Sequence, residues 1–171
     1  MSNSSAPNTP SGKVDELESA RQINGYLNHY VTVTDAKAIG LIAGVFASAA
    51  FLLKDIPCAN SGIFWAYCIA ALSHAFAASL GLAAIYPRVP SMGTSVIFWE
   101  DINLRKSLGD YLKAYKATCS SGFLDEEYAT QNYYVSKVLH RKTALVRWSI
   151  RVFVLALVAG LAVYAVTPHP K

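Results

Sequence analysis

Charged residues are scarce in this chain. Only 15% of its 171 residues are Asp, Glu, Lys or Arg, whereas an ordinary soluble domain holds about 25%. Apolar residues make up 53% of the chain, and its mean hydropathy is +0.29. Much of the chain must therefore be surrounded by lipid, because a soluble surface needs more charge. This composition argues against a soluble enzyme.

Sequence motifs for catalysis and metal binding are also missing. The chain has no Walker loop, no GxSxG or HExxH motif and no paired set of carboxylates. Its cysteines, Cys58, Cys68 and Cys119, form no CxxC pair and have no histidine partners at metal-ligand offsets. We therefore predict that the protein is not an enzyme and holds no metal ion or cofactor.

Three apolar runs have the composition of membrane spans. Ala38 to Leu53 and Gly62 to Tyr86 carry no charged residue, and the second is long enough to cross a hydrocarbon core of roughly 30 Å. The third run covers about 148–166, where Trp148 and Arg151 supply interfacial anchors at one end. The sequence thus predicts three transmembrane helices.

The distribution of basic residues predicts the orientation of these spans. Lysines and arginines crowd into the stretch from Arg88 to Arg151, whereas the loop from Lys54 to Ser61 holds a single lysine. The positive-inside rule places the basic stretch in the cytoplasm. We therefore predict a cytoplasmic N-terminus, with Cys58 and Cys119 on opposite sides of the membrane. We attribute the net charge of +4 to this orientation, and we predict no nucleic-acid partner.

The polar segments predict helices on the cytoplasmic side. Residues 1–13 have the composition of a disordered tail, and an amphipathic helix begins near Val14 and leads into the first span. A helical hairpin covers about 98–147, with an apolar spacing that resumes at Leu104 and a turn at Ser120 to Gly122. The predicted fold is an all-α membrane protein, with residues 14–171 as a single domain.

Two features inside the spans each allow a structural and a functional interpretation. Gly40, Gly44 and Ser48 recur every four residues and permit close helix contacts, within one subunit or in a homo-oligomer. We expect a homo-oligomer. His74 lies in the middle of the second span, where a titratable group is a functional candidate by default. The structural reading is a neutral histidine that bonds a neighbouring helix.

Several charged residues are predicted to lie at one depth, where the spans meet the cytoplasm. Such a ring could bind a phosphate through charge-assisted hydrogen bonds, or it could contact lipid headgroups. The residues are Asp35, Lys37, Arg88, Arg141, Lys142 and Arg147. We favour headgroup contact for most of them individually, and a ligand site for Arg88.

Four segments in a fixed order resemble the small transmembrane effectors of Pycsar antiphage systems. The segments are VTVTDAKAIG at Val31 to Gly40, AIYPR at Ala84 to Arg88, VIFWEDI at Val96 to Ile102, and YATQNYYVSKVLHRKTALVRW at Tyr128 to Trp148. The resemblance covers about Leu27 to Val166.

The resemblance implies a function and a ligand. Effectors of this kind are encoded beside a pyrimidine cyclase, whose product, cyclic CMP or cyclic UMP, activates them to damage the bacterial inner membrane and kill the infected cell. By position, the residues that match the family's pattern are Asp35, Lys37, Tyr86, Pro87, Arg88, Ser136 and Lys142. Asp35, Lys37, Arg88 and Lys142 are the candidate ligand-binding set. The chain shows no β-roll of the usual cyclic-nucleotide-binding kind, so sensing would fall to the helices.

Two other functions compete with this one. The protein could be a passive membrane anchor that docks a soluble partner on the face from Leu104 to Tyr115. It could also be a constitutive small channel or carrier subunit, although His74 as the only central ionisable group makes a poor ion path.

Overall fold

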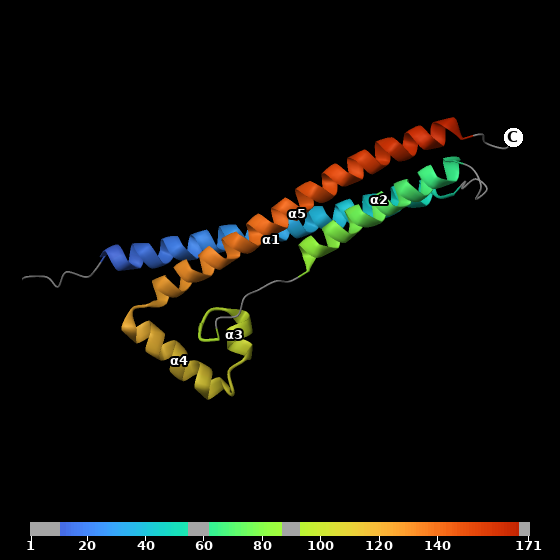
Figure 1. Ribbon diagram of the computed structural model, residues 1–171. Helices are drawn as coiled ribbons and strands as arrows, with labels where there is room; N and C mark the ends of the chain where they lie inside the picture. Colours follow the sequence, from blue (N-terminus) through green and yellow to red (C-terminus); the bar gives the residue numbers. More distant parts are fainter. Residues whose placement is uncertain (1–10, 55–61, 87–92, 168–171) are drawn as a thin grey trace, which may run out of the picture. The chain divides into compact units, whose positions relative to one another are not determined.

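The computed structural model describes residues 11–54, 62–86 and 93–167, with side chains from Asp15 onward. Within these residues the regular structure is entirely helical, which confirms the predicted all-α fold. The helices are α1 (Ser11–Leu52), α2 (Gly62–Ile85), α3 (Trp99–Asn103), α4 (Leu108–Ser121) and α5 (Leu124–Val166) (Figure 1). The predictions made for residues 1–10, for Cys58 and for Pro87 and Arg88 fall outside the described residues.

The chain divides into two compact units. We call Tyr30–Arg88 together with Val138–Lys171 the span unit, and Met1–His29 together with Val89–Lys137 the hairpin unit. Helices α1 and α5 each contribute residues to both units.

Three helices confirm the predicted spans. α1, α2 and α5 are each long and apolar enough to cross a membrane. α2 has 24 residues, so at 1.5 Å per residue it is about 36 Å long, which exceeds the roughly 30 Å of a hydrocarbon core. α1 begins at Ser11, within the segment 1–13 that the sequence suggested as a tail. The predicted amphipathic helix and the first span therefore form one helix, since no proline or turn separates them.

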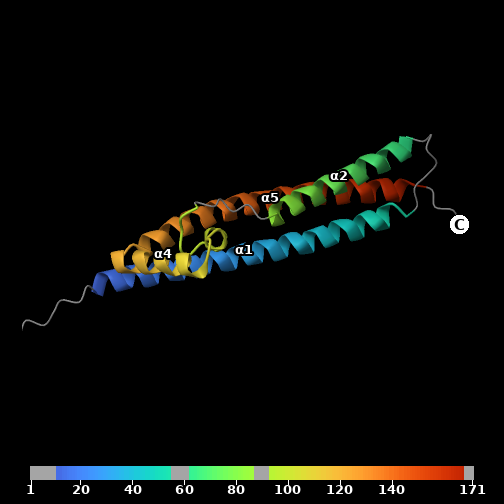
Figure 2. The ribbon, with the colours of Figure 1, turned by 90° about the horizontal axis from the view of Figure 1, so that it is seen from below.

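Side-chain packing in the span unit joins α1, α2 and α5. The three helices lie side by side, and α1 and α5 run in the same direction while α2 runs in the opposite one (Figures 1 and 2). The buried residues of α1 recur at intervals of four and seven, which is the spacing of knobs-into-holes packing. They are Thr34, Ala38, Val45 and Leu52, and on α5 the corresponding set is Lys142, Val146, Ser149, Ala156 and Gly160.

The hairpin unit contains α3 and α4, whose ends are set by local chemistry. The predicted helix at Leu104 begins only at Leu108, because Ser107 caps α4 by accepting a hydrogen bond from the Asp110 amide at 3.1 Å. Gly122 ends α4 with a φ of 74°, a conformation that favours glycine. The apolar spacing of α4 marks an exposed face, since Leu108 is 71% exposed and no residue of α4 is buried.

Candidate functional site

The span unit contains a largely buried ion pair between α1 and α5. Lys142 Nζ lies 2.6 Å from Asp35 Oδ1, and the exposed fractions of the two side chains are 9% and 30%. Both residues come from the set predicted to bind a ligand. An ammonium group this deeply buried requires a partner, because an unpaired charge loses its hydration without compensation.

The apolar cluster beside the ion pair fixes where these two side chains point. Asp35 lies one turn before Ala38 on α1, and Lys142 lies one turn before Val146 on α5. Ala38 and Val146 pack against Ala84 at the end of α2. The cluster therefore holds all three helices together next to the pair, and a change in the pair acts on helix packing directly.

Among the described residues, no hydrogen bond or ion pair joins another predicted site residue to this pair. Lys37 is exposed, Tyr86 is exposed, and Arg88 falls outside the described residues. Ser136 belongs to the hairpin unit, where its hydroxyl donates to the Tyr133 carbonyl of its own helix at 2.7 Å. The structure thus brings together two members of the predicted set, Asp35 and Lys142.

Polar side chains also connect the helices deeper in the span unit. The Ser149 hydroxyl donates to the Ala77 carbonyl at 2.7 Å, and the Tyr67 hydroxyl donates to Thr167 Oγ1 at 3.3 Å. The first bond joins α5 to α2, and the second joins α2 to the residue that directly follows α5. Such bonds between spans contribute about 0.6 kcal/mol each. Ser149 is not among the residues predicted from the sequence, although its spacing of three and four residues from Val146 and Phe153 places it in the buried seam of α5.

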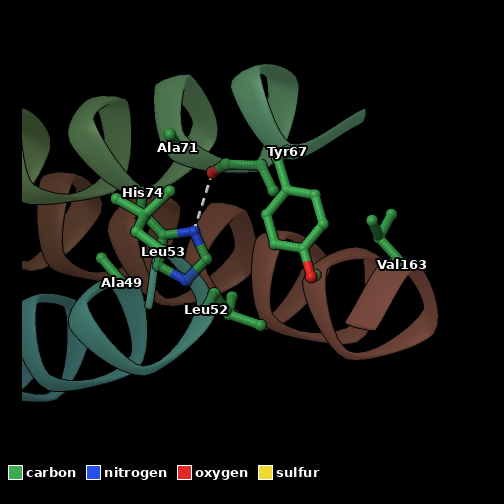
Figure 3. A pocket seen from close by; sticks show the side chains of 9 residues that line it. Ala49, Leu52, Leu53, Tyr67, Ala71, His74 and Val163 are labelled. Atoms are coloured by element: carbon green, nitrogen blue, oxygen red, sulfur yellow. Dashed lines mark hydrogen bonds between the residues drawn. The ribbon is translucent and has the colours of Figure 1, made fainter. Parts of the chain in front are cut away.

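His74 differs from its predicted structural role. Its Nδ1 lies 2.8 Å from the Ala70 carbonyl of its own helix, so the expected bond to a neighbouring helix is wrong. Its Nε2 is buried and has no hydrogen-bond partner. A buried polar group without a partner costs about 1–3 kcal/mol. Figure 3 shows the ring with Ala49 and Leu52 of α1 on one side and Tyr67 of α2 nearby.

The VIFWEDI segment contains the end of the 93–98 loop and most of α3, and Asp101 of α3 bonds back to this loop. The buried carboxylate of Asp101 accepts hydrogen bonds from the Gly93 amide at 2.9 Å and the Ser95 amide at 3.1 Å. The Ser95 hydroxyl donates to Glu127 Oε2 at 2.7 Å, which ties the loop to the first turn of α5. The role of Asp101 is therefore to hold the shape of this loop.

A second polar contact joins α1 to α5 within the hairpin unit. Asn24 donates to Asn132 Oδ1 at 2.9 Å, and the Asn132 amide donates to the Ala20 carbonyl at the same distance. Paired asparagines in a seam of helices select one register, because any shift leaves them without partners. Nothing in the spacing alone marked this pair as a site.

Among the described residues, no group of three or more His, Cys, Asp and Glu side chains is arranged to hold a metal ion. The described cysteines, Cys68 and Cys119, are free thiols.

Comparison with protein families identifies the chain. The PycTM model, which describes the Pycsar effector protein domain, matches residues 19–168. The chain belongs to this family. The match covers all four segments on which the resemblance was noted, from Val31 to Trp148, and it confirms that resemblance. Comparisons with curated proteins and with solved structures found no match.

Family membership establishes the general role of the protein. A Pycsar effector is the downstream component of an antiphage defence system, not the cyclase, and the system implies a cognate cyclase as its partner. Family membership and the three helices of membrane-spanning length together indicate a membrane protein.

Proposed function

We propose that this Pycsar effector is a dormant membrane protein that a cyclic pyrimidine nucleotide, cyclic UMP or cyclic CMP, activates when phage infects the cell. The activated protein then breaches the bacterial inner membrane, and the cell dies before phage matures. Family membership and three apolar helices support this proposal. The excess of lysine and arginine between Arg88 and Arg151 supports a cytoplasmic N-terminus and a cytoplasmic hairpin.

The observation that carries the proposed ligand site is the ion pair between Asp35 and Lys142. The phosphate of a cyclic nucleotide is an anion, as the Asp35 carboxylate is, and either anion forms charge-assisted hydrogen bonds with an ammonium group. When the phosphate replaces the Asp35 carboxylate, the Lys142 ammonium group still has an anionic partner. The displaced carboxylate is already 30% exposed, so water can solvate it. This exchange releases the contact that holds α1 to α5.

Two further cations complete the proposed site. Lys37 is exposed two residues beyond Asp35 on the same helix, and it supplies a second ammonium group without first breaking a contact. Arg88 enters the site through the family resemblance, as a group able to bind phosphate oxygens in a bidentate manner. In the proposed site, Lys37, Arg88 and Lys142 bind the phosphate, and Asp35 is the carboxylate that the phosphate displaces.

Binding measurements with two variants of opposite effect test the exchange of anions. We expect Lys142→Gln to weaken binding of cyclic UMP or cyclic CMP to the purified protein at least tenfold, in equilibrium dialysis. Asp35→Asn should strengthen binding about tenfold, because the ligand no longer competes with a carboxylate. Lys54→Gln is the control, since Lys54 is exposed beyond the end of α1. Loss of affinity in both Asp35→Asn and Lys142→Gln would show that the ligand bridges the pair instead.

Uptake of a membrane-impermeant dye tests the membrane function. Cells would express the protein with an active pyrimidine cyclase or with its catalytically dead version. We expect dye uptake only with the active cyclase. Absence of uptake in both cases, with expression confirmed, would contradict the proposed permeabilisation.

Assembly into a homo-oligomer is part of this proposal. A Cβ atom added to Gly40 would meet nothing within 4 Å, whereas one added to Gly44 would touch the Phe153 ring. Gly40 therefore leaves part of the α1 surface open for close approach by another subunit. Crosslinking in membranes, with and without nucleotide, measures the subunit number.

A passive membrane anchor is the second candidate function. The face of α4 favours it, because Leu108, Leu112 and Tyr115 are all exposed and could dock a soluble partner. An anchor would show no change in permeability with any nucleotide, so the dye measurement separates the two functions.

A further inference from the structure

The second span contains a polar atom that its surroundings leave without a partner. His74 is 2% exposed. The Ala70 carbonyl can only accept, so Nδ1 carries a proton and donates it across the 2.8 Å contact. Nε2 is buried, and no hydrogen-bond partner in the described structure reaches it. In this packing the histidine cannot satisfy its hydrogen-bonding capacity.

The pocket around His74 is narrow and has no charged residue in its lining. Its lining comes from α1, α2 and α5 and leaves no space for a water molecule (Figure 3). The lining residues include no Asp, Glu, Lys or Arg, and Tyr67 is the only other titratable group among them. The Phe153 ring also approaches His74, with its centroid at 6.0 Å. The pocket as it stands is therefore dry.

A small separation of α1, α2 and α5 would let water into this pocket. Half of the eight residues that line the pocket with His74 are small: Ala49, Ala70, Ala71 and Gly160. Leu52 packs directly against Gly160, so α1 and α5 are in close contact there. A buried water needs two to four polar partners. Separation of the helices would expose Nε2 to water, and it would free the hydroxyl of Tyr67, another lining residue, which bonds Thr167 in the present packing.

We infer that the water path of the activated protein runs between α1, α2 and α5 of one subunit and passes His74. Water that enters this path gives Nε2 the partner it lacks, so hydration favours the separated helices over the closed ones. The inference rests on the proposed permeabilisation, and it specifies where in the spans the breach occurs. The competing location is the outer surface of the spans, between subunits.

Cysteine accessibility distinguishes the two locations. In a background with the native cysteines replaced by serine, His74→Cys and Ala70→Cys report on the pocket. Leu72→Cys is the matched control. Leu72 lies on the same helix, about 3 Å from His74 along the helix axis, and it is 70% exposed on the outer surface. Cells would be treated with a small, cationic, membrane-impermeant methanethiosulfonate, with active or dead cyclase, and dye uptake would be measured in the same cultures.

We expect active cyclase to speed modification of Cys at positions 74 and 70 at least tenfold, with no change at position 72. The two pocket positions guard against a folding defect in either variant. Dye uptake without modification at 74 and 70, or with modification at 72 instead, would overturn the inference and leave the proposed function standing. Absence of dye uptake in the native protein would overturn the proposed function itself.

Discussion

Removal of the Asp35 carboxylate should destabilise the protein more than removal of the whole ion pair. Asp35→Asn leaves the Lys142 ammonium 9% exposed and without its partner at 2.6 Å. Loss of one partner costs about 3–5 kcal/mol in a fully buried pair and about 0–1 kcal/mol in an exposed one. The 30% exposure of Asp35 places this pair between the limits, so we expect a loss of about 2 kcal/mol, or roughly 30-fold in the unfolding equilibrium.

Asp35→Asn, Lys142→Met and the variant with both changes form a double-mutant cycle. The second and third of these have distinct expected results. Lys142→Met keeps the apolar stem and leaves a carboxylate that water partly solvates, so we expect a loss of about 1 kcal/mol. The double variant leaves no unpaired charge and should be close to the native protein in stability. The coupling energy between the two positions is therefore about 2–3 kcal/mol.

Unfolding of the purified protein by sodium dodecyl sulfate in mixed micelles, followed by tryptophan fluorescence, measures these values. The decisive comparison is between the double variant and Asp35→Asn, because the double variant must have the higher free energy of unfolding. Additive effects, with a coupling energy within about 0.3 kcal/mol of zero, would refute the interaction and with it the role of this pair in holding α1 to α5.

Four further substitutions test other contacts, three of them in the same unfolding assay and the fourth by limited proteolysis. Gly81→Ala should destabilise the span unit by about 1–2 kcal/mol, because its Cβ would lie 2.9 Å from Ile42 Cγ1. Gly25→Ala has open space around it, so it should raise the free energy of unfolding by up to about 1 kcal/mol. Equal effects at both glycines would contradict this packing. Asn132→Leu should cost about 1–2 kcal/mol through its two lost hydrogen bonds, and an unchanged stability would show that this pair contributes nothing. Asp101→Asn replaces one acceptor with a donor that faces a backbone amide, so limited proteolysis should cleave the 93–98 loop several times faster; a native cleavage rate would rule out the carboxylate as the support of the loop.

Much of the fold could be predicted from the sequence because its signals are local. An uncharged run as long as Gly62 to Tyr86 has few alternatives to a membrane helix, since every backbone polar group must be satisfied within the segment. The turn predicted at Ser120 to Gly122 marked the end of α4 for an equally local reason, the conformational freedom of glycine. The helix at Leu104 was placed too early because apolar spacing continued through a loop that ends at the Ser107 cap.

The candidate site was predicted only in part. Asp35 and Lys142 were chosen as charged residues at one depth, and the family resemblance pointed to them as well. Neither argument indicated that they bond each other, because residues 107 positions apart become neighbours only through the packing of α1 against α5.

The sequence by itself determined that this protein is helical, that it has three spans, and that it is a Pycsar effector. These properties follow from composition, periodicity and short motifs, which a linear chain carries in full. Only the tertiary structure decided that Lys142 is paired, that Asp101 holds a loop, and that His74 Nε2 lacks a partner. A hydrogen bond or its absence depends on which atoms of distant segments come within about 3 Å, and only the packed helices fix that distance.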